Sequence, residues 1–216
     1  MNTTERSGIA NTNPKVNSIA KLQHSEPTVT LLGRIAGGHA GRVGLIGGGH
    51  KKDLHFTLII EDSYTGIFGF DGQPGIDPTS KPSIIQTGVD TVFPLAGIIR
   101  AVGLIKIKTN YYRNTLPSDI LINIKIDPPQ GMASSMFASK LIAKACGFAD
   151  YKIDYSAPSG IIGETMVRGE YNSSSYIAGL LNSIMGYVPK INTPGYQAPG
   201  WESPIPSEYF KDASCN

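Results

Sequence analysis

The chain has 216 residues, of which 40% are hydrophobic and 17% charged, and its formal net charge is +2 at pH 7. This length and composition suit one domain with a substantial core. They argue against a nucleic-acid-binding protein, because no basic stripe with interleaved aromatic residues occurs. No apolar run has the length of a membrane span, and no N-terminal signal peptide is recognisable. We therefore expect synthesis in the cytoplasm, no nucleic-acid partner and no membrane span.

The distribution of polar and apolar residues predicts one folded domain between two short flanking segments. Residues 1–26 are polar and lack periodicity, which is typical of a flexible lead-in. Residues 27–210 contain every periodic segment and form the predicted domain, and residues 211–216 form a polar tail. Five segments have the apolar pattern of strands, namely residues 28–32, 54–60, 67–70, 102–108 and 120–126. The second and third of these strands are close enough in sequence to form a hairpin.

Two later segments predict helices, at residues 132–145 and at 173–185, and each is followed by a glycine that can end it. Strands that precede helices in this way predict an α+β fold, with an antiparallel sheet of about five strands and both helices packed on it. The proline-rich stretch of residues 188–205 is expected to wrap over the body in an extended form, because its Trp201 needs an apolar site.

Two cysteines, Cys146 and Cys215, lack the spacing of metal ligands, and the sequence gives no basis for pairing them. We expect no metal and no cofactor. The helix at 173–185 opens with a run of hydroxyl residues, which allows two interpretations. Asn172 and Ser173 can be helix caps. Alternatively, Ser173 can be a nucleophile at the positive end of the helix dipole, with His55 of the second strand as its base.

The hairpin register predicts the residue that orients His55. If Ile60 and Ile67 flank the turn, His55 lies opposite Gly72, within one position of Asp71 and Gln73. Asp71 is the first choice, because a carboxylate accepts a hydrogen bond from the imidazole as the third member of a triad does. A histidine on a strand can equally be a core residue with satisfied hydrogen bonds.

The order of these motifs resembles the circularly permuted papain-like domains, of the NlpC/P60 and lecithin:retinol acyltransferase-like kind, found in bacterial polymorphic toxins and secreted effectors. The resemblance covers roughly residues 54–210. It rests on the strand with His55, on Pro128-Pro129-Gln130-Gly131-Met132 before a helix, on Tyr171-Asn172-Ser173-Ser174-Ser175-Tyr176, and on Pro199-Gly200-Trp201-Glu202-Ser203-Pro204-Ile205-Pro206. In those families the helix opens with Asn-Cys, so Asn172 matches the asparagine and Ser173 matches the nucleophilic cysteine.

This serine leaves three alternatives: a serine hydrolase on a cysteine-enzyme scaffold, an inactive binding relative, or an engineered serine. The resemblance implies a papain-like hydrolase or acyltransferase that acts on an amide or ester. Ser173 would be the nucleophile, His55 the base and Asp71 its orienting partner, while Asn172, Ser175 and Gln73 would contact the substrate.

The resemblance also implies a substrate and partners. A bacterial effector of this kind would act on peptidoglycan or a protein, would leave the cell through a specialised secretion system and would have an immunity protein as partner. Two alternatives stay open. One is a non-catalytic papain-like module that binds a peptide, a glycan or a partner protein, and the other is a structural component of a secretion or surface assembly.

Overall fold

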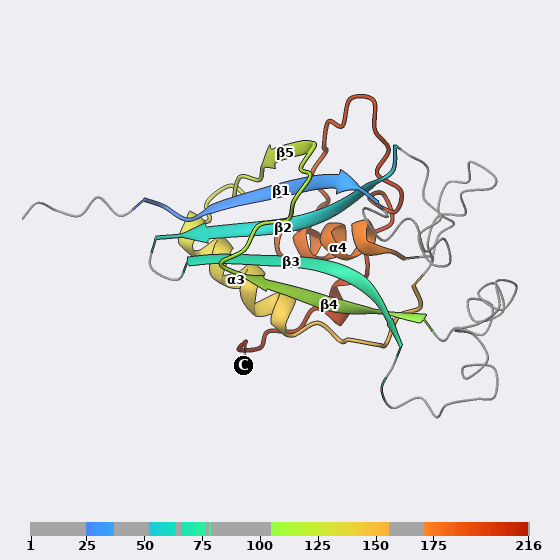
Figure 1. Cartoon of the computed structure of the whole chain (residues 1–216). Helices are drawn as coiled ribbons and strands as arrows, with labels where there is room; N and C mark the ends of the chain where they lie inside the picture. Colours follow the sequence, from blue (N-terminus) through green and yellow to red (C-terminus); the bar gives the residue numbers. More distant parts are fainter. Residues whose placement is uncertain are drawn as a thin grey trace, which may run out of the picture.

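Figure 1 shows the computed structural model of the chain. It describes residues 25–36, 52–63, 66–76, 78, 105–155 and 171–215. Nearly all of the predicted lead-in, residues 1–26, therefore lies outside the described residues. The elements are the strands β1 (Thr28–Ile35), β2 (Leu54–Asp62), β3 (Gly66–Ile76), β4 (Ile105–Arg113) and β5 (Ile122–Lys125), the helices α3 (Ser134–Cys146) and α4 (Ser173–Met185), and the 3₁₀ turn η3 (Ser207–Tyr209).

The described strands form one antiparallel sheet in the order β4-β3-β2-β1-β5. Leu31 of β1 pairs with Leu58 of β2, and Leu58 pairs in turn with Phe70 of β3. Because side chains alternate between the faces of a strand, these pairs bring apolar residues into rows on one face. The predicted five-stranded antiparallel sheet with two packed helices is confirmed.

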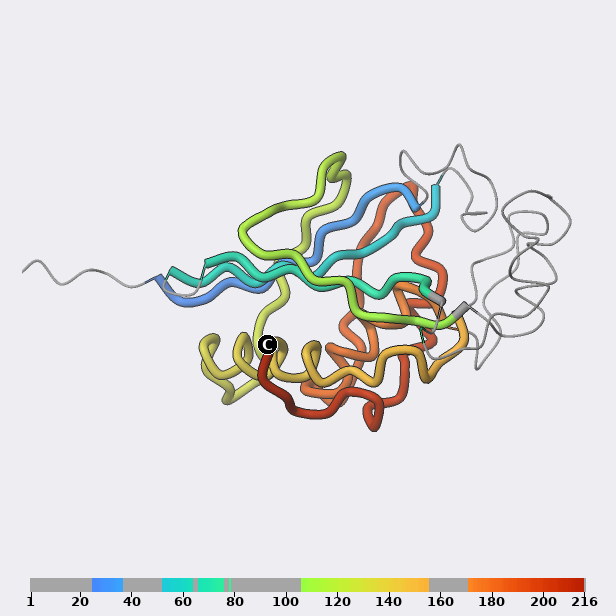
Figure 2. The backbone as a smooth tube through the Cα atoms, turned by 60° about the horizontal axis from the view of Figure 1, so that its bottom comes forward, coloured from blue at the N-terminus to red at the C-terminus, as the bar shows by residue number. Residues whose placement is uncertain are grey.

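The sheet has two different faces. The inner face packs on the helices and buries alternate residues of β2, namely Leu54, Phe56, Leu58 and Ile60, against Phe137 and Leu141 of α3 and Ile177 and Leu180 of α4. Each fully buried side chain of this kind contributes roughly 1.5–3 kcal/mol. Figure 2 shows the sheet nearly edge-on, with both helices on one side and the connection from β4 to β5 on the other. The outer face is the one that this connection crosses.

The helices begin and end as the sequence predicts, to within two residues. Asn172 is the N-cap of α4, and its Oδ1 accepts hydrogen bonds from the backbone N–H groups of Ser174 and Ser175. Gly186 ends α4 in the left-handed conformation, which favours glycine. In contrast, α3 begins at Ala133 without a side-chain cap. Both helices have 13 residues, and no helix in the described part of the chain is long and apolar enough to cross a membrane.

Gly72 allows α4 to lie close to β3. A Cβ atom at this position would be only 2.5 Å from Cβ of Tyr176, which is fully buried. Any larger residue would push the helix away from the strand. The contact also fixes the orientation of β3, because Gly72 faces the helix and its neighbour Asp71 therefore faces outward.

The chain after α4 wraps over the body in an extended form, as predicted. Trp201 is 3% exposed, and its indole N–H donates to the carbonyl of Pro189 at 3.0 Å. Its ring meets Phe56 of β2 edge-on, with the ring centroids 5.2 Å apart. The wrap is therefore anchored in the same core as the sheet.

Residues 211–215 of the predicted polar tail, residues 211–216, run along the end of α3. The N–H groups of Lys211 and Ala213 donate to the carbonyls of Gly147 and Ala143 at 3.2 and 3.1 Å. Lys144 pairs with Asp212 at 3.4 Å. Cys146 and Cys215 form a disulfide, with their Cα atoms 5.2 Å apart. No local sequence signal predicts this pairing, because the two residues are 69 positions apart.

We predict that replacing both Cys146 and Cys215 with serine lowers the free energy of unfolding by about 2–4 kcal/mol, because the disulfide restricts a long loop of the unfolded chain. Thermal unfolding monitored by circular dichroism measures the loss. Reduced wild-type protein should unfold at the same temperature as the double variant. Equal midpoints for oxidised and reduced wild type would contradict the disulfide.

Candidate functional site

A cluster of polar side chains surrounds Asp71 on the outer face of the sheet. The Asp71 side chain is fully buried, at 0% exposure. Its Oδ2 lies 2.9 Å from Nε2 of His55 and accepts hydrogen bonds from the hydroxyls of Tyr112 at 2.8 Å and Thr57 at 3.4 Å. Nη2 of Arg34 lies 3.8 Å from the same oxygen. We call these five residues the Asp71 cluster.

Four strands bring the Asp71 cluster together. Arg34 of β1 pairs directly with His55 of β2, and Leu58 of β2 pairs with Phe70 of β3. This register places Asp71 opposite Thr57. His55 lies two residues before Thr57 and is therefore its next neighbour along β2 on the outer face. Tyr112 comes from β4, where it pairs with Gly69. The missing side chain of Gly69 leaves room for Tyr112, because a Cβ there would be 3.1 Å from Cβ of Tyr112.

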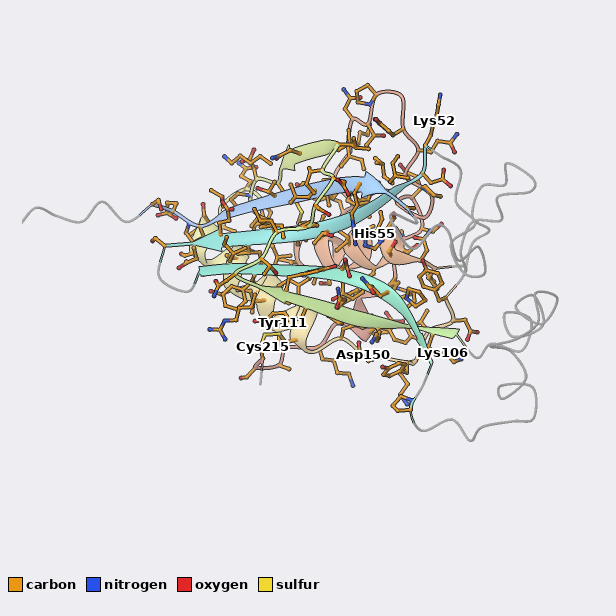
Figure 3. The ribbon with its side chains drawn as sticks, in the orientation of Figure 1. Lys52, His55, Lys106, Tyr111, Asp150 and Cys215 are labelled. Carbon is orange, nitrogen blue, oxygen red and sulfur yellow. A yellow bond between two sulfur atoms is a disulfide. The ribbon has the colours of Figure 1, made fainter. Side chains whose placement is uncertain are left out.

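The contact between His55 and Asp71 fixes which ring nitrogen carries the proton. A carboxylate oxygen can only accept, so Nε2 of His55 donates to Oδ2 of Asp71. In the neutral imidazole the other nitrogen, Nδ1, is then an acceptor of protons. The side chain of His55 is 14% exposed. Figure 3 labels His55 near the start of β2. A histidine oriented by a buried carboxylate in this way can act as a general base. The predicted contact between His55 and Asp71 is present, although the observed hairpin register differs by one residue, with Ile60 opposite Phe68.

Burial and the neighbouring Asp71 affect Tyr112. The pKa of Tyr112 is raised to about 12, mainly by burial. The negative charge of Asp71 and the hydrogen bond that Tyr112 donates to it raise the pKa further. Each cause favours the neutral phenol over the phenolate. Tyr112 therefore stays a hydrogen-bond donor to the carboxylate across the physiological range.

The N-terminus of α4 is a second polar group, but it lies on the inner side of the sheet. Asn172 spans two segments, because its Oδ1 accepts from Ser174 and Ser175 while its Nδ2 donates to the carbonyl of Pro199 at 2.8 Å. The Ser175 hydroxyl donates to the carbonyl of Gly200 at 3.0 Å. Asn172 and Ser175 thus tie the helix start to the wrap around Trp201. Both residues are buried in structural contacts, a placement that does not favour the predicted contact with substrate.

No contact between Ser173 and His55 is found among the described residues, and the directions of their side chains argue against the predicted catalytic contact, which stays a prediction. The hydroxyl of Ser174 in α4 donates to the backbone carbonyl of Leu54 at 3.4 Å. The side chains of Leu54 and Phe56 point to the inner face. His55 lies between them in the strand and must point to the outer face. The sheet therefore separates its imidazole from Ser173, which is itself only 6% exposed.

Gln73 follows the same alternation. It lies two positions after Asp71 in β3 and hence on the outer face, half-buried, near the end of the strand where His55 lies. No hydrogen bond of its side chain is recorded among the described residues. Its predicted contact with substrate remains a prediction. Within the same described ranges, no group of three or more His, Cys, Asp or Glu side chains could hold a metal ion.

Sequence reasoning missed Arg34, Thr57 and Tyr112. Arg34 lies just beyond the predicted first strand, and Tyr112 lies beyond the predicted end of the fourth strand at residue 108, which in fact continues to Arg113. Thr57 was detectable, because it alternates with Phe56 and Leu58 and shares the face of His55.

Comparison of the chain with protein-family models, with curated proteins and with solved structures finds no match. The function must therefore be argued from the Asp71 cluster and the other contacts of the chain itself.

We predict that the free energy of unfolding falls more steeply between pH 10 and pH 12 in the wild type than in Tyr112→Phe. A folded-state pKa raised from 10.0 to about 12 stabilises the fold fully below pH 10, and this contribution is lost as the pH rises through 12. Urea unfolding across this range measures it. Tyr187→Phe, at an exposed tyrosine, is the matched control and should follow the wild type. Parallel profiles for all three proteins would contradict the prediction.

Proposed function

We propose that the protein is an amide or ester hydrolase in which His55 is the general base and Asp71 orients it. The observation that carries this proposal is the 2.9 Å contact between His55 Nε2 and the fully buried Asp71 carboxylate. A carboxylate is costly to bury, and three donors and a guanidinium are gathered to hold this one in place. A buried carboxylate that is held in this way beside a partly exposed histidine is typical of the site of a catalytic base.

The reaction that fits the dyad uses water as its nucleophile. Nδ1 of His55 takes a proton from a water molecule while the water oxygen forms a bond to the substrate carbonyl carbon. The tetrahedral intermediate then collapses, the bond to the leaving nitrogen or oxygen breaks, and the same proton passes from His55 to the leaving group. Asp71 holds the ring and stabilises its positive charge during the step. The hydroxyls of Thr57 and Tyr112 donate to the carboxylate and hold it in position.

The papain-like assignment stays part of this proposal in a modified form. The order of the elements supports it, because a strand with histidine precedes a helix that opens with Asn172 and packs on the sheet. A papain-like reaction through Ser173 is not supported, because that residue lies on the inner side of the sheet. We therefore propose a relative that keeps the histidine and its carboxylate and dispenses with the covalent intermediate. Peptidoglycan or a protein amide is the proposed substrate, and an immunity protein the proposed partner.

The disulfide between Cys146 and Cys215 supports export. Disulfides persist in oxidising compartments and are rare in the reducing cytosol. Backbone hydrogen bonds and one ion pair also hold the segment before Cys215 against α3, so the bond joins parts of the chain that other contacts already bring together. We propose that the protein works outside the cytoplasm after passage through a specialised secretion system.

A second candidate function is a non-catalytic module that binds a peptide, a glycan or a partner protein. The burial of Ser173 favours it, because a nucleophile must reach its substrate and Ser173 is only 6% exposed. In this case the Asp71 cluster would be a rigid polar floor that recognises hydrogen-bonding groups of the ligand.

We predict that His55→Gln lowers kcat on peptidoglycan or on an activated ester by about 10²–10⁴-fold, because the general base is lost. Asp71→Asn should also lower the rate, because the amide no longer holds the ring in the required tautomer. Ser173→Ala is the matched control and should retain the wild-type rate. Dye release from labelled peptidoglycan and p-nitrophenyl acetate hydrolysis measure the rates, and circular dichroism checks that each variant folds.

Two results would overturn this assignment. Loss of activity in Ser173→Ala with His55→Gln unaffected would restore the serine mechanism. No turnover by the wild type, together with retention on peptidoglycan or a peptide column, would favour the binding module.

A further inference from the structure

Arg34 is the member of the Asp71 cluster that makes an ion pair but no hydrogen bond to another described residue. It pairs directly with His55 across β1 and β2, and its side chain is 29% exposed. Nη2 approaches Asp71 Oδ2 only to 3.8 Å, which is an ion-pair distance but too long for a hydrogen bond. Nε of Arg34 is buried and has no hydrogen-bond partner in the part of the chain that the structure describes.

The crowding at Asp71 explains this geometry. Oδ2 already receives Nε2 of His55 and the hydroxyls of Tyr112 and Thr57, so no direction remains for the guanidinium at this oxygen. Oδ1 has no hydrogen-bond partner among the described residues, so the guanidinium does not bond to it either. Arg34 thus compensates the charge of Asp71 through space and keeps its N–H donors. Buried donors in native proteins normally have a partner. An unpaired guanidinium N–H beside a histidine with an available ring nitrogen is therefore a place for an acceptor group of a ligand.

We propose that Arg34 binds a carboxylate of the substrate, adjacent to the bond that His55 helps to hydrolyse. This inference rests on the proposed function and specifies its substrate class: peptides with a free carboxylate next to the scissile amide or ester. A guanidinium pairs well with the two coplanar oxygens of a carboxylate. The charge of the cluster favours a monoanion, because Asp71 already places one negative charge 3.8 Å from Nη2 and would repel a phosphate dianion.

The competing arrangement is a purely internal ion pair, in which Arg34 closes on Asp71 and takes up its unpaired Oδ1. In that arrangement the guanidinium donors that face the cluster bind Asp71 rather than a ligand. The two arrangements differ in what removal of Arg34 does: a substrate site loses affinity for one class of ligand, whereas an internal pair affects all ligands through the stability of the cluster.

The test compares a peptide substrate that has a free C-terminal carboxylate with the same peptide as its C-terminal amide. For Arg34→Gln we expect KM for the acid to rise at least about tenfold, because a charge-assisted hydrogen bond is lost. KM for the amide should change little, and any fall in kcat, which depends on Arg34 through the charge of Asp71, should be the same for both peptides. Arg34→Lys should restore part of the affinity. Arg113→Gln, at an exposed arginine that stacks on Phe68, is the matched control and should resemble the wild type. An equal rise in KM for both peptides would overturn the proposal.

A binding measurement separates this proposal from the proposed function. N-acetylglycine, N-acetylglycinamide and inorganic phosphate are titrated into wild type and Arg34→Gln, and the His55 ring resonances are followed by NMR. Binding of N-acetylglycine alone, abolished by the substitution, supports the carboxylate site even if no substrate is turned over. No binding of N-acetylglycine to the wild type, or tighter binding of phosphate, would overturn it even if the protein proves to be a hydrolase.

Discussion

The alternation of side chains along β2 decides the chemistry that this molecule can perform. Leu54, Phe56 and Leu58 fill the core between the sheet and the two helices. His55 and Thr57 must then point the other way, because successive side chains of a strand face opposite sides. A shift by one residue would bury the imidazole and expose three large apolar side chains, which is strongly unfavourable. The core thus fixes the face of the sheet on which His55 lies.

Asp71 is the polar counterpart of that core. Its position follows from Gly72, which must face the helix because Tyr176 occupies the space where a side chain would be. The carboxylate is left on the outer face without access to solvent, and only charged or hydrogen-bonding neighbours make such burial tolerable. Arg34, Thr57 and Tyr112 can therefore be understood together, as the groups that allow a negative charge to remain beside His55.

The sequence predicted the elements well because each has a strong local signal. Apolar alternation predicted the sheet, and Asn172 and Gly186 marked the ends of α4. The site was predicted only in part. The contact between His55 and Asp71 depends on one hairpin, which is local enough to estimate. The roles of Arg34 and Tyr112 depend on pairings across four strands, and the extent of β4 could not be read because its second half is polar. The alternation of Leu54, His55 and Phe56 is the sequence signal that places His55 on the face away from its apolar neighbours.

The link between Cys146 and Cys215 has a consequence for how the chain responds to proteases. The two residues enclose α4, the extended wrap and η3 within a covalent loop. One cut of the backbone anywhere inside this loop leaves both fragments joined by the disulfide. The C-terminal segment, residues 211–215, therefore stays in place along α3. A nicked molecule would migrate as an intact chain until a reductant separates the pieces. Resistance to a single cleavage is thus built into the C-terminal part of the protein, which carries α4.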